Sequence, residues 1–104
     1  MLVNKSSYSA GDILAFKIVN GDEIVGKLVQ ETLDSFEIDQ PCTVVPSQQG
    51  IGLIQSLFTV DPKTAINISK THVIMHAPVI PQMENHYIQT TTGIQQMPKR
   101  SIIV

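Results

Sequence analysis

The stretch from Phe16 to Gln30, FKIVNGDEIVGKLVQ, constrains the fold most, because it predicts two antiparallel strands joined by a tight turn. Asn20-Gly21 between two apolar runs is a strong β-hairpin signal, and a two-residue type I′ turn requires positive φ at both positions. Gly26 falls in the middle of the second predicted strand, where a glycine usually marks a bulge, a bend or a close backbone approach. The stretch therefore predicts a hairpin whose second strand bends sharply.

The rest of the chain repeats the same short-strand pattern, and no segment shows apolar spacing near 3.6 residues over a helical length. Pro41 and Pro46 flank one run and indicate an edge or a bulge there, while residues 47–52 are expected to form a loop. The chain is thus predicted to be all-β with five or six short strands, and Gly26 suits a strand that curls around a small barrel. The predicted strands are 13–19, 23–30, 36–45 with the apolar parts 36–39 and 42–45, 53–60, 65–69 and 72–75.

Both ends of the chain differ from this central pattern. Residues 1–11 form a polar lead, and residues 78–104 are rich in Gln, Thr and Pro with a weak apolar pattern. We expect a barrel over residues 12–77, followed by an extended C-terminal tail with few core contacts. Tyr87 and Ile88 are the tail residues expected to dock it.

Composition limits the classes of function. Apolar residues make up 42% of the 104 residues and charged residues only 15%, so some apolar surface is expected to be hidden in an assembly. The net charge of −2 argues against a chain that binds nucleic acid through overall basic charge, so any nucleic-acid site must be a local basic patch. The single cysteine excludes an internal disulfide, and no apolar run resembles a signal peptide or a membrane span. A cytoplasmic protein is the expectation.

The order of these features resembles the Sm/LSm family. Residues 19–28, VNGDEIVGKL, match the strand, turn and strand of the first family motif, with Gly21 as the turn glycine and Gly26-Lys27-Leu28 as its G-x-L. Residues 68–75 keep the apolar frame of the second motif, with Ser69 and Lys70 in place of its Arg-Gly. The long 46–65 connection and the tail are similar to the short Sm-like proteins of marine cyanophages. The resemblance implies a small, strongly bent, five-stranded antiparallel Sm-like barrel.

The family resemblance also implies a homo-oligomeric ring, from pentamer to heptamer, that binds single-stranded RNA or DNA and serves RNA processing or chaperoning. The loop residues that correspond to the family's binding positions would carry this function. Lys70 would hold phosphate as a point charge, and His72 would stack on or hydrogen-bond a base. The alternative for these residues is a solvated turn. The full predicted nucleic-acid site comprises Asp34, Ser35, Lys70, Thr71 and His72.

Other functions have weaker support in the sequence. A phage structural or assembly ring with protein partners, acting in the host cytoplasm, is the alternative function. His72 and His76 would share a strand face near His86, yet metal ligation needs a preorganised site, and surface histidines are the simpler interpretation. Cys42 suits a small buried residue better than a nucleophile. No cofactor motif or catalytic spacing is evident, so we expect no enzyme.

Overall fold

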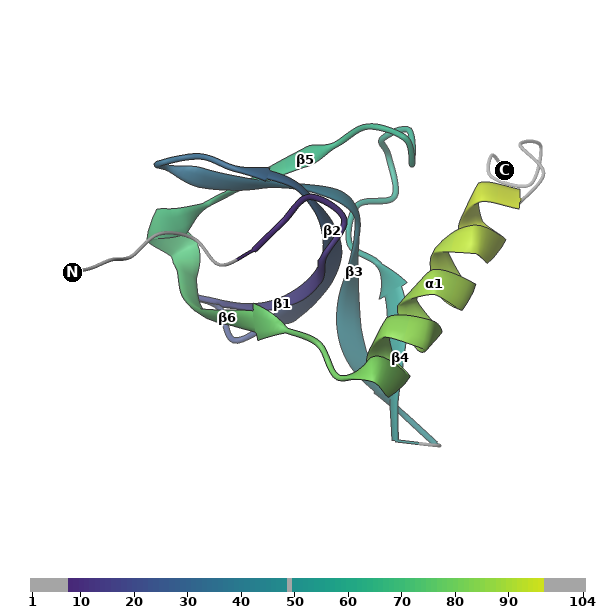
Figure 1. The fold of residues 1–104 in the computed structure, drawn as a ribbon. Coiled ribbons are helices and arrows are strands. Elements are labelled where there is room, and N and C mark those ends of the chain that lie inside the picture. Colours follow the sequence, from purple (N-terminus) through teal and green to yellow (C-terminus); the bar gives the residue numbers. More distant parts are fainter. Residues whose placement is uncertain (1–7, 49, 97–104) are drawn as a thin grey trace.

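The computed structural model describes residues 8–48 and 50–96, and in them it places six strands, a short 3-10 helix and one α-helix (Figure 1). The chain is therefore all-β apart from one helix near its C-terminus. The elements are β1 (Ile13–Ile18), β2 (Glu23–Glu31), β3 (Ser35–Ser47), β4 (Gly50–Gln55), β5 (Ile66–Ser69), η1 (Lys70–His72), β6 (Val73–Pro78) and α1 (Pro81–Gln96).

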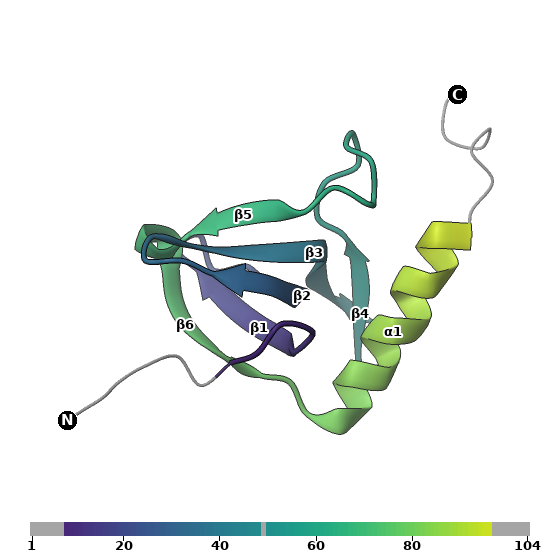
Figure 2. The same cartoon turned by 45° about the horizontal axis from the view of Figure 1, so that its top comes forward.

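The strands form one curled antiparallel sheet in the order β4-β3-β2-β1-β6, with β5 paired to β3 beside this path. β3 is 13 residues long, and its first part pairs with β5 while its second part pairs with β4. η1 makes the corner between β5 and β6, and α1 lies outside the curl beside β4 (Figures 1 and 2). Within the described residues, β4, β5 and β6 each pair with one strand only, so each of them has one side without a partner strand.

The described chain has six strands, which agrees with the five or six that the alternation predicted and is one more than the five of the Sm-like barrel that the resemblance implies. The predicted runs 36–39 and 42–45 are two parts of one strand, β3, and a bulge at Gln40 and Pro41 lies between them. Residues 50–52, expected in a loop, join β4 through a tight turn in which Gly50 has a φ of 119°. The predicted run 53–60 ends at Gln55, and residues 56–65 connect β4 to β5 without regular structure.

The hairpin around Asn20-Gly21 is confirmed, although its turn is not the two-residue type I′ turn. Only Gly21 has positive φ, at 94°, and its N–H donates to the Ile18 carbonyl at 2.8 Å. This is a three-residue loop that ends in a left-handed glycine. The Asn20 side chain accepts from the Asp22 N–H at 2.9 Å, so asparagine stabilises the turn by its amide oxygen and needs no positive φ.

Gly26 lies where the sheet bends, as the sequence predicted. A Cβ placed there would stand 2.9 Å from Ile38 Cδ1 and 3.4 Å from the Asp39 carbonyl oxygen. The pairing of β2 with β3 slips at the same place, because Val25 faces Cys42 while Lys27 faces Asp39. β3 therefore carries an extra residue opposite Gly26, and glycine permits the close approach of the two strands.

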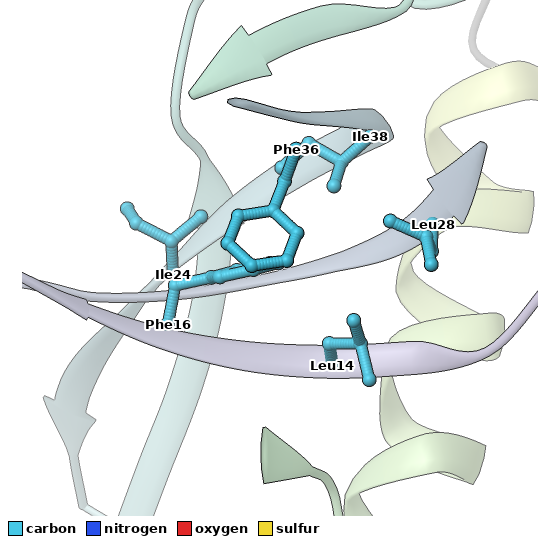
Figure 3. Packing of buried hydrophobic residues seen from close by; sticks show 6 residues of the cluster. All are labelled: Leu14, Phe16, Ile24, Leu28, Phe36 and Ile38. Carbon is cyan, nitrogen blue, oxygen red and sulfur yellow. The ribbon is translucent and has the colours of Figure 1, made fainter. Parts of the chain in front are cut away.

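The inner core fills the concave side of the curl and consists of six buried apolar side chains (Figure 3). They alternate along β1, β2 and the first part of β3, as the period-two pattern predicted. The rings of Phe16 and Phe36 pack at a centroid distance of 4.9 Å. The inner core comprises Leu14, Phe16, Ile24, Leu28, Phe36 and Ile38.

The outer core lies on the opposite face of the sheet, where α1 covers it. It comprises Ile13, Val25, Cys42 and Tyr87, with Met83 and Val79 packed against them. The bulge in β3 makes this possible, since it turns Cys42 to the face opposite Ile38 although the two residues are four positions apart. β3 thus contributes to both cores.

The extended tail was wrong: residues 81–96 form α1. Pro81 opens the helix, where its fixed φ is favourable and its missing N–H costs nothing. Met83, Tyr87 and Thr91, spaced by one helical turn, face the sheet. Docking by Tyr87 is confirmed because its side chain is 1% exposed, whereas Ile88 is 44% exposed and does not dock. Residues 1–7 of the predicted lead and 97–104 of the predicted tail lie outside the described residues.

Candidate functional site

Three turns meet at one end of the sheet, which we call the loop end: residues 19–22, 32–35 and 70–72. The Lys70 N–H donates to the Asp34 carbonyl at 2.8 Å, and Ser35 pairs with Ser69 across β3 and β5. The Val19 N–H donates to the His72 carbonyl at 2.9 Å. The structure therefore brings together the two loops that carry the predicted nucleic-acid residues, and adds the β1–β2 hairpin beside them.

Lys70 is held within the loop end by two contacts. Its Nζ lies 2.6 Å from Glu31 Oε2, and it sits 5.1 Å from the centroid of the Phe36 ring. The two side chains of the ion pair are 31% and 21% exposed. Glu31 thus compensates the charge of Lys70 locally, and a phosphate would have to compete with this carboxylate.

The other predicted site residues differ in how they are held. Asp34, Thr71 and His72 are exposed. Thr71 Oγ1 lies 2.8 Å from Ser69 Oγ, which also accepts from the Thr71 N–H and so caps η1. The Ser35 hydroxyl lies 3.1 Å from Thr32 Oγ1 within its own turn. The site can thus offer exposed imidazole, hydroxyl and carboxylate groups, while Ser35 mainly closes the turn.

Sequence reasoning missed Glu31, because it falls in a predicted polar turn directly after a strand, where a carboxylate is usually solvated. Its partner Lys70 is 39 positions away, and no spacing rule connects them. The three turns of the loop end carry the carboxylates of Asp22 and Asp34 and the amine of Lys70, whose charge Glu31 compensates from the end of β2. This end of one copy is therefore slightly acidic.

The three histidines do not converge on one point. His72 lies in η1, His86 lies on α1, and His76 lies on β6 with its Nδ1 2.8 Å from the Tyr8 hydroxyl. The His76 ring also packs edge-on against Phe36 at a centroid distance of 5.0 Å. Within residues 8–48 and 50–96, no group of three or more His, Cys, Asp or Glu side chains is placed to hold a metal ion. His76 therefore belongs to the rim of the inner core.

The open side of β6 is the second candidate site, and we call it the β6 edge. In the described chain β6 pairs only with β1, and Ile74 and Met75 are 57% and 60% exposed. A shallow groove of about 270 Å³ runs beside it, lined by Lys17, Glu23, Met75, His76 and the small side chains of Ala15 and Ala77. An open strand edge with exposed apolar side chains and little charge is a surface for strand pairing.

Cys42 is fully buried in the outer core, which confirms the prediction that it is a small core residue. Burial raises the pKa of its thiol from 9.0 to about 11. Burial is also the main cause that raises the pKa of the Tyr87 phenol above its ordinary value of 10.0. Both groups are therefore protonated at neutral pH, and the Cys42 thiolate is not available as a nucleophile.

No helix among the described residues combines the length and the apolar character needed to cross a bilayer. Comparison with protein-family models and with curated proteins finds no match to this chain.

Proposed function

We propose that this protein is a homo-oligomeric assembly module whose copies join through the open edges of the bent sheet. The β6 edge is the observation that carries this proposal. Edge strands of monomeric proteins are usually protected by charges, prolines or a covering segment. From Ile74 to Ala77 the β6 edge has no Lys, Arg, Asp or Glu, and Ile74 and Met75 remain exposed.

The geometry favours a head-to-tail contact, because the open strands are chemically different. β5 and β4 are open on one side of the sheet path and β6 is open on the other. If β6 of one copy pairs with β5 or β4 of the next, the contact is heterologous, and such contacts close into rings when the rotation permits. Exposed Ile51 and Ile54 on β4 offer apolar partners for the exposed side chains of β6. A ring of five to seven copies is the form that the family resemblance implies.

Sedimentation velocity of the wild type and of Ile74→Lys tests the proposal. A lysine on an open edge blocks pairing with another strand and leaves the interior of the monomer unchanged. We expect an oligomer for the wild type and a monomer for Ile74→Lys at micromolar concentration. Leu33→Lys, which adds the same charge at a side chain that is 91% exposed in the 32–35 turn, is the matched control and should stay oligomeric. A monomeric wild type would contradict the proposal.

Single-stranded nucleic-acid binding at the loop end is a second candidate function. The contact between the Lys70 N–H and the Asp34 carbonyl supports it, since both predicted loops then lie side by side. In a ring, Lys70 and the exposed His72 would repeat once per copy around one face, which would raise the local density of groups that can contact phosphates and bases. The ion pair with Glu31 works against phosphate binding, so the loop end supports this function less strongly than the β6 edge supports assembly.

Binding of a short uridine-rich RNA, measured at two salt concentrations, tests this second function. Phosphate contacts release counterions, so a true site loses affinity as salt rises. Lys70→Gln removes the charge without placing a second carboxylate beside Glu31, as Lys70→Glu would. Lys63→Gln, at an exposed lysine in the 56–65 connection, is the control. Weaker binding by Lys70→Gln alone supports the loop end as the site, while no binding by the wild type at low salt removes this function.

A further inference from the structure

The hydroxyl of Tyr87 forms the main polar contact between α1 and the sheet. Its Oη lies 2.8 Å from the Asp39 carbonyl oxygen and 3.0 Å from the Gln40 carbonyl oxygen, so one O–H is shared between two acceptors. These carbonyls belong to the bulge of β3, and the Tyr87 side chain is almost fully buried. The aromatic ring alone would fill the outer core, so the hydroxyl has a separate role that a phenylalanine could not supply.

The bulge that Tyr87 contacts is conformationally strained. Gln40 has a φ of 47°, and among the described residues it is the one non-glycine residue with positive φ. A side chain in this left-handed region costs roughly 1 kcal/mol or more and persists only where the surroundings hold it. Pro41 follows directly, and its carbonyl accepts from the Ser56 N–H at 2.9 Å. Tyr87 on α1 thus contacts the carbonyls of Asp39 and of Gln40 itself, and the segment after β4 contacts the carbonyl of Pro41.

The bulge also divides β3 into two parts with different partners. Residues 35–38 pair with β5, and residues 42–47 pair with β4. The face of β3 that lines the inner core before the bulge turns outward after it, as Ile38 and Cys42 show. The conformation at Gln40 therefore sets the angle between the two halves of the sheet, and with it the directions in which the open sides of β5 and β4 point.

We propose that α1 is a latch that sets this angle, with the Tyr87 hydroxyl as the positioning group that holds the bulge of β3. The proposal rests on the proposed function in one respect: the open edges, whose relative direction the latch sets, are the surfaces that join neighbouring copies. In a closed ring, the rotation per copy decides the number of copies. The latch would therefore control how many copies close the ring, while the β6 edge decides whether they associate.

The test compares Tyr87→Phe with the wild type by amide hydrogen exchange and by native mass spectrometry. Removing the hydroxyl leaves two partly buried carbonyls without this donor, so the amides in the segment 39–43, in which Pro41 has none, should exchange about tenfold faster or more. The oligomer should become heterogeneous in copy number. Tyr8→Phe, which removes the hydroxyl that contacts His76 on β6, is the matched control and should leave exchange at residues 39–43 unchanged.

A second variant separates a latch from a general loss of packing. Glycine adopts positive φ freely, so Gln40→Gly relieves the strain that Tyr87 helps to hold. Added to Tyr87→Phe, it should restore slow exchange in residues 39–43 and a single oligomer mass. Failure of this rescue, or wild-type exchange and mass in Tyr87→Phe, would overturn the latch. A monomeric wild type would instead contradict the proposed function and the link to copy number, while exchange at residues 39–43 still decides whether Tyr87 holds the bulge.

Discussion

The inner and outer cores are built from the same strands but depend on different physical terms. The inner core consists of aliphatic and phenyl side chains from β1, β2 and β3, so burial of apolar surface alone can stabilise it. The outer core needs a helix from the C-terminal region, and it includes a thiol and a phenol with raised pKa values. The inner core should therefore determine whether the sheet folds, and the outer core should respond to pH and to the docking of α1.

The largest effect that separates the two cores should come from truncating their apolar side chains. Phe16 is fully buried against Phe36, so Phe16→Ala should lower the free energy of unfolding by about 3–5 kcal/mol. Met83, on α1, is only partly buried, and Met83→Ala should cost roughly 1 kcal/mol. Urea unfolding measures both values. Equal losses would mean that the two cores contribute alike to the stability of the sheet.

A smaller effect is expected where the inner core meets the bend. Gly26→Val places carbon within 3 Å of Ile38, and this overpacking should lower the free energy of unfolding by about 1–3 kcal/mol. The control is Gly52→Val on β4, where a Cβ would meet its nearest neighbour at 3.7 Å. That variant should stay within about 0.5 kcal/mol of the wild type. A wild-type melting temperature in Gly26→Val would show that β2 and β3 do not approach closely there.

The smallest effect concerns alkaline pH and the outer core. In the unfolded chain the Cys42 thiol ionises near its ordinary pKa of 9.0, whereas in the folded chain its pKa is about 11. The unfolded chain therefore binds fewer protons over this interval, and the free energy of unfolding falls as the pH rises. Between about pH 9 and pH 10 the decrease should be on the order of 1 kcal/mol. The raised pKa of Tyr87 acts in the same direction.

Cys42→Ala provides the control for this pH dependence. The variant should lose part of the decrease above pH 9 that the wild type shows, because only the thiol has been removed. Urea midpoints measured at matched pH values give the comparison. Identical pH profiles of the wild type and Cys42→Ala would show that the thiol does not become more acidic on unfolding.

The strands of the inner core were predictable because apolar and polar residues alternate along them, and this alternation follows directly from burial of one face. Phe16, Phe36 and Ile38 were placed inward from their spacing alone, and Asn20-Gly21 located the hairpin. At the prolines of β3 the sequence left an edge and a bulge as alternatives, because the place of the bulge depends on the pairing with the strand that carries Gly26. Local patterns predict which residues of a strand are buried, but they do not predict a bulge that depends on pairing with a neighbouring strand.

α1 was missed for a similar reason. Of the three residues that face the sheet one turn apart, only Met83 and Tyr87 are large and apolar, and Thr91 buries a hydroxyl by donating to the Tyr87 carbonyl at 2.9 Å. A helix of this kind is stabilised by its docking surface and not by its own sequence. At the loop end, the resemblance grouped Asp34 and Lys70 in one predicted site, and the Lys70 N–H donates to the Asp34 carbonyl. The ion pair with Glu31 could not be foreseen, because it depends on the curl of the sheet.

Amide hydrogen exchange of the wild type at two protein concentrations tests directly whether copies join through their open edges. β6 residues 73–77, together with β5 residues 66–69 or β4 residues 50–55 as the partner strand, should exchange slowly in a concentrated sample, where copies are paired. The same amides should exchange faster after dilution below the dissociation constant, while β2 stays protected in both samples. Equal exchange of β4, β5 and β6 at both concentrations, together with a monomeric mass throughout, would contradict the account.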